Sequence, residues 1–442
     1  MIFPNVRVGK QELSVFLFVT ALILVVVASK FEPELSPSIN LMQLLLVFVL
    51  YVSLNEINFE LIPNYLNPKI LFLLLAGFHL VSILLTQLDQ LKPYLLWSKL
   101  GFGSMYLNSD LFIFGDLAHL TSWANCKIPI EIGSTLCDPF LRPSNQNPHV
   151  LSFFRFFDLS NLIAIGFIII CAFYFLVYSL FKSHKTFNFK LLILCLSPTI
   201  VLALERNNEV LTILLITYGL LFINQSKKQI YGSLFLVLAA IFKLWPIVIV
   251  GLSLCFKWKE LSLGSKLVLS GGLFYWIVFL NNIFNMRNFT QNGSYFGGSF
   301  GFPLFFTDRA SQVWMGLFLL FSFIFLAYLV KDKSQFKVAG STEVATLTIL
   351  FICYIFVWVS GISWAYRLLL LLPMLYFLEN SQLSKEIIKR TTNLILVTLL
   401  TIQLSVTIFM TSILSVYFLA FIIVNSNSIK RDCLSIFNKY FV

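Results

Sequence analysis

Three basic residues stand at short polar interruptions between long apolar segments: Arg206, Lys243 and Arg367. A cation held next to a nonpolar environment usually has a partner or marks an ion pathway. The simpler alternative for each is that its long side chain reaches water at the edge of the nonpolar region. Three such positions together favour a site for an anion. Phosphate is the natural candidate, because Arg and Lys both bind phosphate well.

Carboxylates are the second group of residues that could do chemistry, and they gather in one earlier segment. Asp116 directly follows Gly115 between apolar residues, and no turn motif follows it. Asp138 precedes Pro139, and Asp-Pro is an ordinary turn signal. A turn or a helix cap is the structural alternative for both residues. Asp116 is therefore the stronger candidate for a chemical role.

Other chemistries have no matching pattern in the chain. There is no glycine-rich phosphate loop, no His/Cys cluster with metal-ligand spacing and no Gly-x-Ser-x-Gly motif. We therefore expect neither a metal nor a cofactor.

The composition indicates which elements must position these residues. Of the 442 residues, 58% are hydrophobic and only 12% are charged, whereas soluble domains average roughly 25% charged residues. The apolar runs are long and repeated, as in helices that span a hydrocarbon layer about 30 Å thick. The sequence therefore predicts an all-α polytopic membrane protein with about 12–14 transmembrane helices.

The net charge of +11 is explained by basic clusters between the apolar runs, so nucleic-acid binding is not needed to account for it. Because Lys and Arg collect on the cytoplasmic side of membrane proteins, we expect these clusters to lie inside. They are Lys182, Lys185 and Lys190; Lys227 and Lys228; Lys257, Lys259 and Lys266; Lys331, Lys333 and Lys337; Lys385, Lys389 and Arg390; and Lys430, Arg431 and Lys439.

This orientation predicts the path of the chain. Spans near 13–29, 38–54 and 69–86 are followed by an extracytoplasmic segment over 87–158 and a span near 159–181. The remaining spans form hairpins whose tips lie outside, at 205–209, 243–246, 285–311, 361–367 and near Met410. Basic residues at both ends of 230–256 favour two short helices with Lys243 at the tip. Cys126 and Cys137 share the outside segment, where a disulfide is permitted but not required.

Three regions follow from this layout. Residues 1–68 form an N-terminal pair of transmembrane helices, 69–380 a central membrane domain that includes the outside segment 87–158, and 381–442 a C-terminal hairpin with a basic cytoplasmic tail.

The order of several short motifs resembles the GT-C superfamily of integral-membrane glycosyltransferases, and within it glycosyltransferase family 87. The resemblance covers roughly 70–375, and each motif is short, so that only their order carries it. The motifs are Gly115-Asp116-Leu117, Asp138-Pro139-Phe140, Asn145 to Pro148, Ser197-Pro198, Arg206 to Glu209, Ala239 to Pro246, and Tyr366-Arg367 through Pro373.

The resemblance implies transfer of a hexose, mannose-like, from a polyprenyl-phosphate donor to a lipid-linked or glycan acceptor. Asp116 would be the general base that takes the proton from the acceptor hydroxyl. Arg206, Lys243 and Arg367 would neutralise the leaving phosphate. A single displacement would invert the anomeric centre. Residues expected to bind substrate are His119, Asp138, Asn207, Asn208 and Tyr366. The expected location is the cell inner membrane, with the site facing the extracytoplasmic side.

Two other functions remain open at this stage. An oligosaccharide polymerase or ligase also has many helices and outside arginines, but its large loop typically comes late in the chain. A lipid or sugar transporter tends to have related halves and charges at the membrane midplane, and neither is apparent here.

Overall fold

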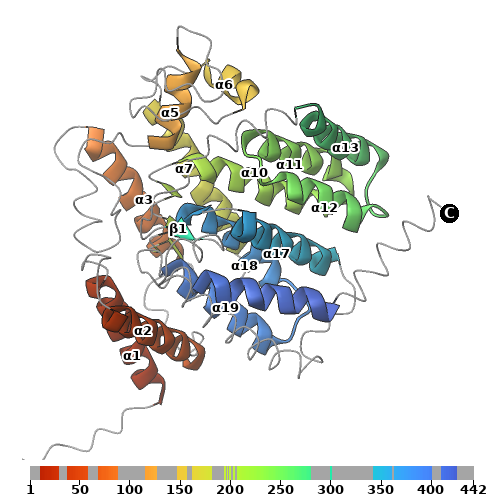
Figure 1. The fold of residues 1–442 in the computed structure, drawn as a ribbon. Helices are drawn as coiled ribbons and strands as arrows, with labels where there is room; N and C mark the ends of the chain where they lie inside the picture. Colours follow the sequence, from red (N-terminus) through yellow and green to blue (C-terminus); the bar gives the residue numbers. More distant parts are fainter. Residues whose placement is uncertain are drawn as a thin grey trace, which may run out of the picture.

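A computed structural model of the chain describes residues 10–28, 37–57, 68–87, 115–126, 147–156, 162–181, 194–195, 197, 199–200, 203–204, 207–279, 299–300, 342–360, 363–400 and 410–425. This part of the chain is helical, apart from two paired strands of two residues each, β1 (Ser299–Phe300) and β2 (Ser363–Trp364). The all-α prediction is therefore confirmed (Figure 1). Arg206, Asp138, Cys137 and the tip of the 285–311 loop before Ser299 lie outside the described residues.

The first helices follow the predicted apolar spans closely. They are α1 (Lys10–Ala28), α2 (Pro37–Glu56), α3 (Pro68–Gln87) and α7 (Leu162–Phe181). Proline opens both α2 and α3, because its fixed φ suits the first helical position and its missing N–H has no helical partner there. Helix α1 packs along α2, and α3 packs against α7.

The described part of the segment predicted as an outside loop between α3 and α7 contains two short helices. These are α5 (Gly115–Ala124) and α6 (Pro148–Phe154), which lie side by side. Arg155 Nε donates to the Ala124 carbonyl at 3.2 Å and so joins their ends.

Four helices form an up-and-down group: α10 (Asn208–Ile223), α11 (Gln229–Phe242), α12 (Ile247–Lys257) and α13 (Leu263–Val278). The two short helices predicted within 230–256 are confirmed as α11 and α12, with Lys243 between them. Helices α10 and α11 approach closely at Gly232, where an added Cβ would lie 2.4 Å from the Ile223 nitrogen. Only a residue without a Cβ fits this crossing.

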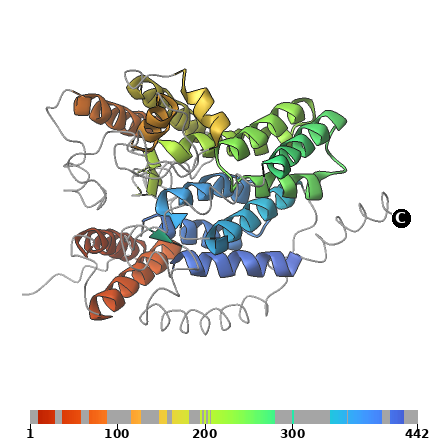
Figure 2. The same cartoon turned by 45° about the horizontal axis from the view of Figure 1, so that its top comes forward.

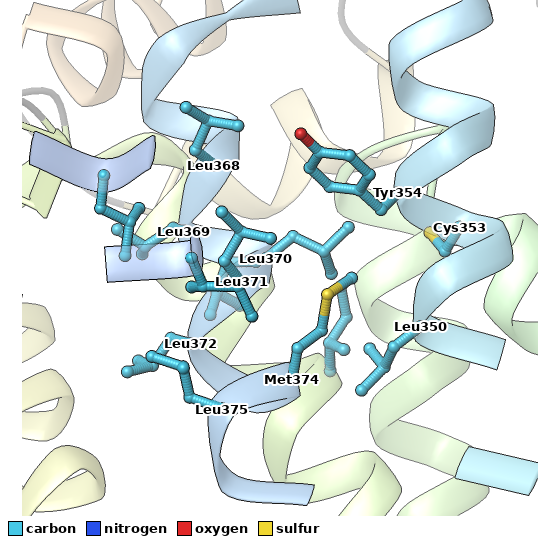
Figure 3. Packing of buried hydrophobic residues seen from close by; sticks show 14 of the residues in the cluster. Leu350, Cys353, Tyr354, Leu368, Leu369, Leu370, Leu371, Leu372, Met374 and Leu375 are labelled. Atoms are coloured by element: carbon cyan, nitrogen blue, oxygen red, sulfur yellow. The ribbon is translucent and has the colours of Figure 1, made fainter. Parts of the chain in front are cut away.

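The C-terminal helices pack beside this group (Figures 1 and 2). They are α17 (Thr342–Ser360), the 3-10 helix η5 (Ala365–Leu370), α18 (Leu371–Glu379) and α19 (Lys385–Leu400), followed by a helical segment over 410–425. Leu370 and Met374 lie on the side of η5 and α18 that faces Leu350 and Tyr354 of α17 (Figure 3). The Phe351 and Phe418 rings stack with centroids 4.0 Å apart, which joins α17 to the 410–425 segment.

The connections place different residues at the two ends of the α10–α13 group. We call one the tip end, where Asn207, Lys243 and Asn147 lie, and the other the basic end, where Asn224, Lys228 and Lys257 lie. Asn147 Nδ2 contacts the Ile241 carbonyl at 3.4 Å at the tip end. Lys257 Nζ donates to Asn224 Oδ1 at 2.7 Å at the basic end.

One basic residue is placed differently from its neighbours in sequence. Lys257 belongs to a cluster predicted at the cytoplasmic surface, yet its side chain is only 1% exposed. Its ammonium group is held by the Asn224 amide at the end of α10. Lys257 is therefore part of the packed interior at the basic end.

Within the described residues, no helix has both the length and the sustained apolar character required to cross a membrane.

Many large apolar side chains point outward from the helices. Phe16 of α1, Leu73 of α3, Phe175 of α7 and Phe274 of α13 are each about two-thirds exposed. Similar exposed residues occur on α2, α11, α17 and the 410–425 segment. Exposed apolar side chains therefore occur on most of the described helices.

Candidate functional site: a buried polar cluster at the tip end

Arg367 and Glu209 form an ion pair inside the tip end. Arg367 Nε lies 3.5 Å from Glu209 Oε1, and the Glu209 side chain is only 1% exposed. Glu209 lies in the first turn of α10, where the helix dipole favours a negative charge. Arg367 comes from η5, and α10 packs directly against η5. Two predicted hairpin tips, 205–209 and 361–367, are thus in contact.

Asn207 adds a buried side-chain amide to this pair, and its backbone has a strained conformation. It precedes α10 with φ 58° and ψ 8°, the only non-glycine residue at positive φ in the described chain. Asn tolerates this left-handed conformation better than most residues. Its backbone N–H donates to the Ala203 carbonyl at 2.7 Å, so the chain closes one helical turn and starts α10 at the same residue.

Apart from the 3.5 Å ion-pair contact with Arg367, the Asn207 and Glu209 side chains have no hydrogen-bond partner in the described protein. The Asn207 amide nitrogen and oxygen are buried without a hydrogen-bond partner there, and so are both carboxylate oxygens of Glu209. Leaving a buried polar group unsatisfied costs about 1–3 kcal/mol. Strained backbone and unsatisfied groups persist where they serve a function more often than elsewhere. Asn207, Glu209 and Arg367 are therefore the strongest candidate site, which we call the polar cluster.

A short strand pair closes the tip end next to Arg367. Strand β1 pairs antiparallel with β2, with Ser299 opposite Trp364 and Phe300 opposite Ser363. β2 leads directly into η5, which carries Arg367. The predicted tips at 285–311 and 361–367 are thus joined by backbone pairing.

Asn147 attaches the α5–α6 segment to the same end. Its side-chain nitrogen donates to the Tyr275 hydroxyl at 2.9 Å, and its side-chain oxygen accepts from the His149 backbone N–H at 3.0 Å. The His149 ring meets the Phe279 ring edge-to-face at 5.2 Å. The Asn-Pro step therefore caps α6 and fixes it to the ends of α11 and α13.

The remaining predicted site residues are placed by their backbone alone. Asp116 is the second residue of α5 and His119 the fifth, while Asn208 opens α10 and Tyr366 lies in η5. The side chains of these four residues lie outside the described part of the structure. A carboxylate in the first turn stabilises a helix N-terminus. The position of Asp116 therefore also supports the alternative in which it only stabilises the start of α5.

Lys243 ends α11 in an extended conformation, and its backbone N–H donates to the Ala239 carbonyl at 2.9 Å. Because α10 and α11 run antiparallel, Lys243 lies at the same end as Asn207. Pro246 follows as the cap of α12. The structure thus brings together Asn207, Lys243 and Arg367 at one end, while Arg206 and Asp138 lie outside the described residues.

Glu209 is the functional candidate that the sequence prediction left out. The available signal was an acid two residues after an asparagine and directly before an apolar helix. The consequence of its position is electrostatic, because its carboxylate offsets the charge of Arg367. Chemically, the polar cluster offers hydrogen-bond donors and acceptors with almost no net charge.

Cys126, two residues after the end of α5, is disulfide-bonded. Cys137, which shares the outside segment and was considered as a possible partner, lies outside the described residues. The bond agrees with the expectation that this segment permits a disulfide.

The fold and the site define an all-α helical protein with a polar cluster buried at one end of its bundle. No model of a known protein family matches the chain, and neither curated proteins nor solved structures match it.

Proposed function

We propose that the protein is a polytopic membrane glycosyltransferase that transfers a hexose from a polyprenyl-phosphate donor to a lipid-linked or glycan acceptor. The observation that carries the proposal is the polar cluster. It is a buried set of hydrogen-bonding groups at one end of a bundle whose exterior is widely apolar.

The membrane part of the proposal is supported by the exposed side chains. Single exposed apolar residues are normal on soluble proteins, but extended apolar surfaces indicate an interaction with another molecule or a membrane. Here such side chains occur on most helices, including α1, α3, α7 and α13. A lipid environment accounts for all of these faces at once.

The catalytic part depends on the arrangement of the tip end. Helix α6 contacts α5, which carries Asp116, and its cap Asn147 also contacts α11 close to Lys243. In the proposed reaction the Asp116 carboxylate takes the proton of the acceptor hydroxyl. The hydroxyl oxygen then bonds to the anomeric carbon, and the bond from that carbon to the phosphate oxygen breaks. The configuration of the sugar is inverted in this single displacement.

The departing polyprenyl phosphate gains negative charge as the bond breaks. Lys243 and Arg206 are proposed to stabilise that charge, as preorganised cations do at other leaving groups. Arg367 contributes less net charge than its type suggests, because Glu209 lies 3.5 Å away. Lysine acts here as a point charge and requires no fixed fork geometry.

The test is to incubate the purified protein in lipid nanodiscs with radiolabelled polyprenyl-phosphate sugars and lipid acceptors, followed by product analysis. We expect a glycosylated acceptor with the opposite anomeric configuration to the donor. A product of retained configuration would contradict the single-displacement mechanism. Repeated addition of preassembled oligosaccharide units would instead indicate a polymerase or ligase.

A further inference from the structure

We propose that the polar cluster binds the hydroxyl groups of an uncharged sugar ring, and that it is not part of the phosphate site. This inference rests on the proposed function and specifies which part of a substrate the cluster contacts. It reassigns Arg367, which the sequence pattern placed with the phosphate-binding cations.

The burial of the cluster indicates that a ligand completes it. Asn207 and Glu209 are each only 1% exposed. Four of their side-chain atoms, the Asn207 amide pair and the Glu209 carboxylate pair, have no hydrogen-bond partner in the described structure. Arg367 is the more accessible member, with 29% of its side chain exposed. A ligand that enters beside the Arg367 side chain would contact the side chains of Asn207 and Glu209, which are already shielded from water.

The chemistry of the cluster selects the kind of ligand. A carboxylate only accepts hydrogen bonds, a guanidinium only donates them, and an amide does both. A sugar hydroxyl both donates and accepts, so neighbouring hydroxyls match this mixed set. Phosphate oxygens only accept and carry negative charge. They would be repelled by the Glu209 carboxylate, whose charge also offsets that of Arg367.

The backbone of Asn207 holds this arrangement in place. Its left-handed conformation ends one helical turn and begins α10. Asn207 and Glu209 are therefore held close together, because only one residue separates them in the chain. Arg367 comes from η5, which packs against α10 and directly follows β2 of the β1–β2 pair. The cluster is thus fixed by two separate parts of the fold.

The hydroxyls have two possible sources, the donor sugar and the acceptor sugar. The test compares wild type, Glu209→Gln, Asn207→Gly and the control Glu386→Gln, all as full-length protein in nanodiscs. The control removes an equivalent charge from an exposed Glu386–Arg390 pair at 2.7 Å. Asn207→Gly removes the amide while glycine accepts φ 58° without strain, so it preserves the fold even if Glu209→Gln destabilises it.

Three measurements distinguish the sources. They are the affinity for a polyprenyl-phosphate sugar, the affinity for sugar-free polyprenyl phosphate, and the acceptor KM. If the cluster holds the donor sugar, both site variants weaken binding of the sugar-bearing donor about 10- to 100-fold. Binding of sugar-free polyprenyl phosphate then stays at the wild-type value. If it holds the acceptor sugar, the acceptor KM rises by a similar factor while both donor affinities are unchanged.

Equal weakening of both polyprenyl compounds would identify a phosphate site and overturn the inference, as would wild-type behaviour of both variants. Saturation-transfer NMR with methyl mannoside and methyl glucoside separates this inference from the proposed function. If wild type binds no polyprenyl phosphate but binds a methyl glycoside that Asn207→Gly releases, the inference stands and the proposed donor is wrong. If wild type binds neither glycoside nor polyprenyl-phosphate sugar, the inference is wrong as well.

Discussion

At the scale of single residues, the proposed mechanism depends most on Asp116 at the start of α5. A side chain that acts as general base typically contributes 10²–10⁴-fold in rate. Asp116→Asn keeps the size of the side chain but removes its ability to take a proton. We therefore expect turnover to fall on about that scale while donor binding is largely kept. The measurement is product formation at saturating donor and acceptor.

Asp110→Asn serves as the matched control, because Asp110 lies in the same sequence segment as Asp116 and is not among the predicted site residues. It should keep turnover close to wild type. An active Asp116→Asn beside an inactive control would mean that the base lies elsewhere in the segment. Thermal stability is measured for each variant, so that misfolding is not mistaken for lost chemistry.

Lys243 gives a second prediction at this scale, because it ends α11 at the tip end next to the start of α10. If it stabilises the donor phosphate, Lys243→Ala should weaken donor use about tenfold or more and leave the acceptor KM unchanged. Lys227→Ala is the control, since Lys227 lies exposed in the short 3-10 helix at the basic end. A defect confined to the acceptor KM would count against a phosphate role for Lys243.

At the scale of elements, the contact between α10 and α11 holds the polar cluster and Lys243 at one end. An added Cβ at Gly232 would lie 2.7 Å from the Gly219 carbonyl oxygen as well as 2.4 Å from the Ile223 nitrogen. Backbone atoms cannot move aside as side chains do, so Gly232→Ala should destabilise the protein by about 1–3 kcal/mol. Thermal unfolding of the purified protein in detergent measures the change.

Gly271→Ala is the matched control, because it changes another helical glycine whose added Cβ would meet no atom within 4 Å. Alanine is the better helix former by up to about 1 kcal/mol. This variant should unfold at the same temperature as wild type or higher. Equal melting of the Gly232 and Gly271 variants would mean that the α10–α11 contact is looser than the structure indicates.

Helices were predictable from the sequence where a long apolar run was bounded or interrupted by charged residues. The bounds of α1, α2, α3 and α7 match the apolar runs, and the break at Lys243 to Pro246 separates α11 from α12. Helices α5 and α6 were not predicted, because ten and seven residues within a polar stretch give little periodic signal. Short helices of this kind are stabilised by packing rather than by propensity.

The polar cluster could be predicted only in part, for a different physical reason. Asn207 and Arg367 stand out as polar residues at apolar boundaries, but their charge balance depends on a contact between distant segments. Nothing in the local sequence indicates that the Glu209 carboxylate faces Arg367. Likewise, Lys257 reads as one of several surface lysines until α12 packs its end against Asn224.

At the scale of the whole molecule, polar contacts between distant segments join segments that the sequence places on the same side of the membrane. Segments predicted outside meet at the tip end, through Glu209 with Arg367 and Ser299 with Trp364. Asn147 of the outside segment contacts Tyr275, in the last turn of α13 that leads to the 285–311 loop. Segments predicted inside meet elsewhere, as in the contacts of Asn224 with Lys257 and of Asn393 with Asn55. This sorting is what alternating hairpins across a membrane would produce, and it can be tested in cells.

The test uses single cysteines and a membrane-impermeant thiol reagent, in a background where Cys255 and Cys433 are replaced by serine. Ser144→Cys lies in the predicted outside segment, and Ser226→Cys lies exposed at the basic end between α10 and α11. We expect the first to label in intact cells and the second only after permeabilisation, because Lys and Arg are retained on the cytoplasmic side. The reversed pattern would place the polar cluster on the cytoplasmic face, where a nucleotide-linked sugar rather than a polyprenyl phosphate would be the accessible donor. Labelling of both positions in intact cells would show that no membrane separates the two ends. That result would contradict the proposed mechanism.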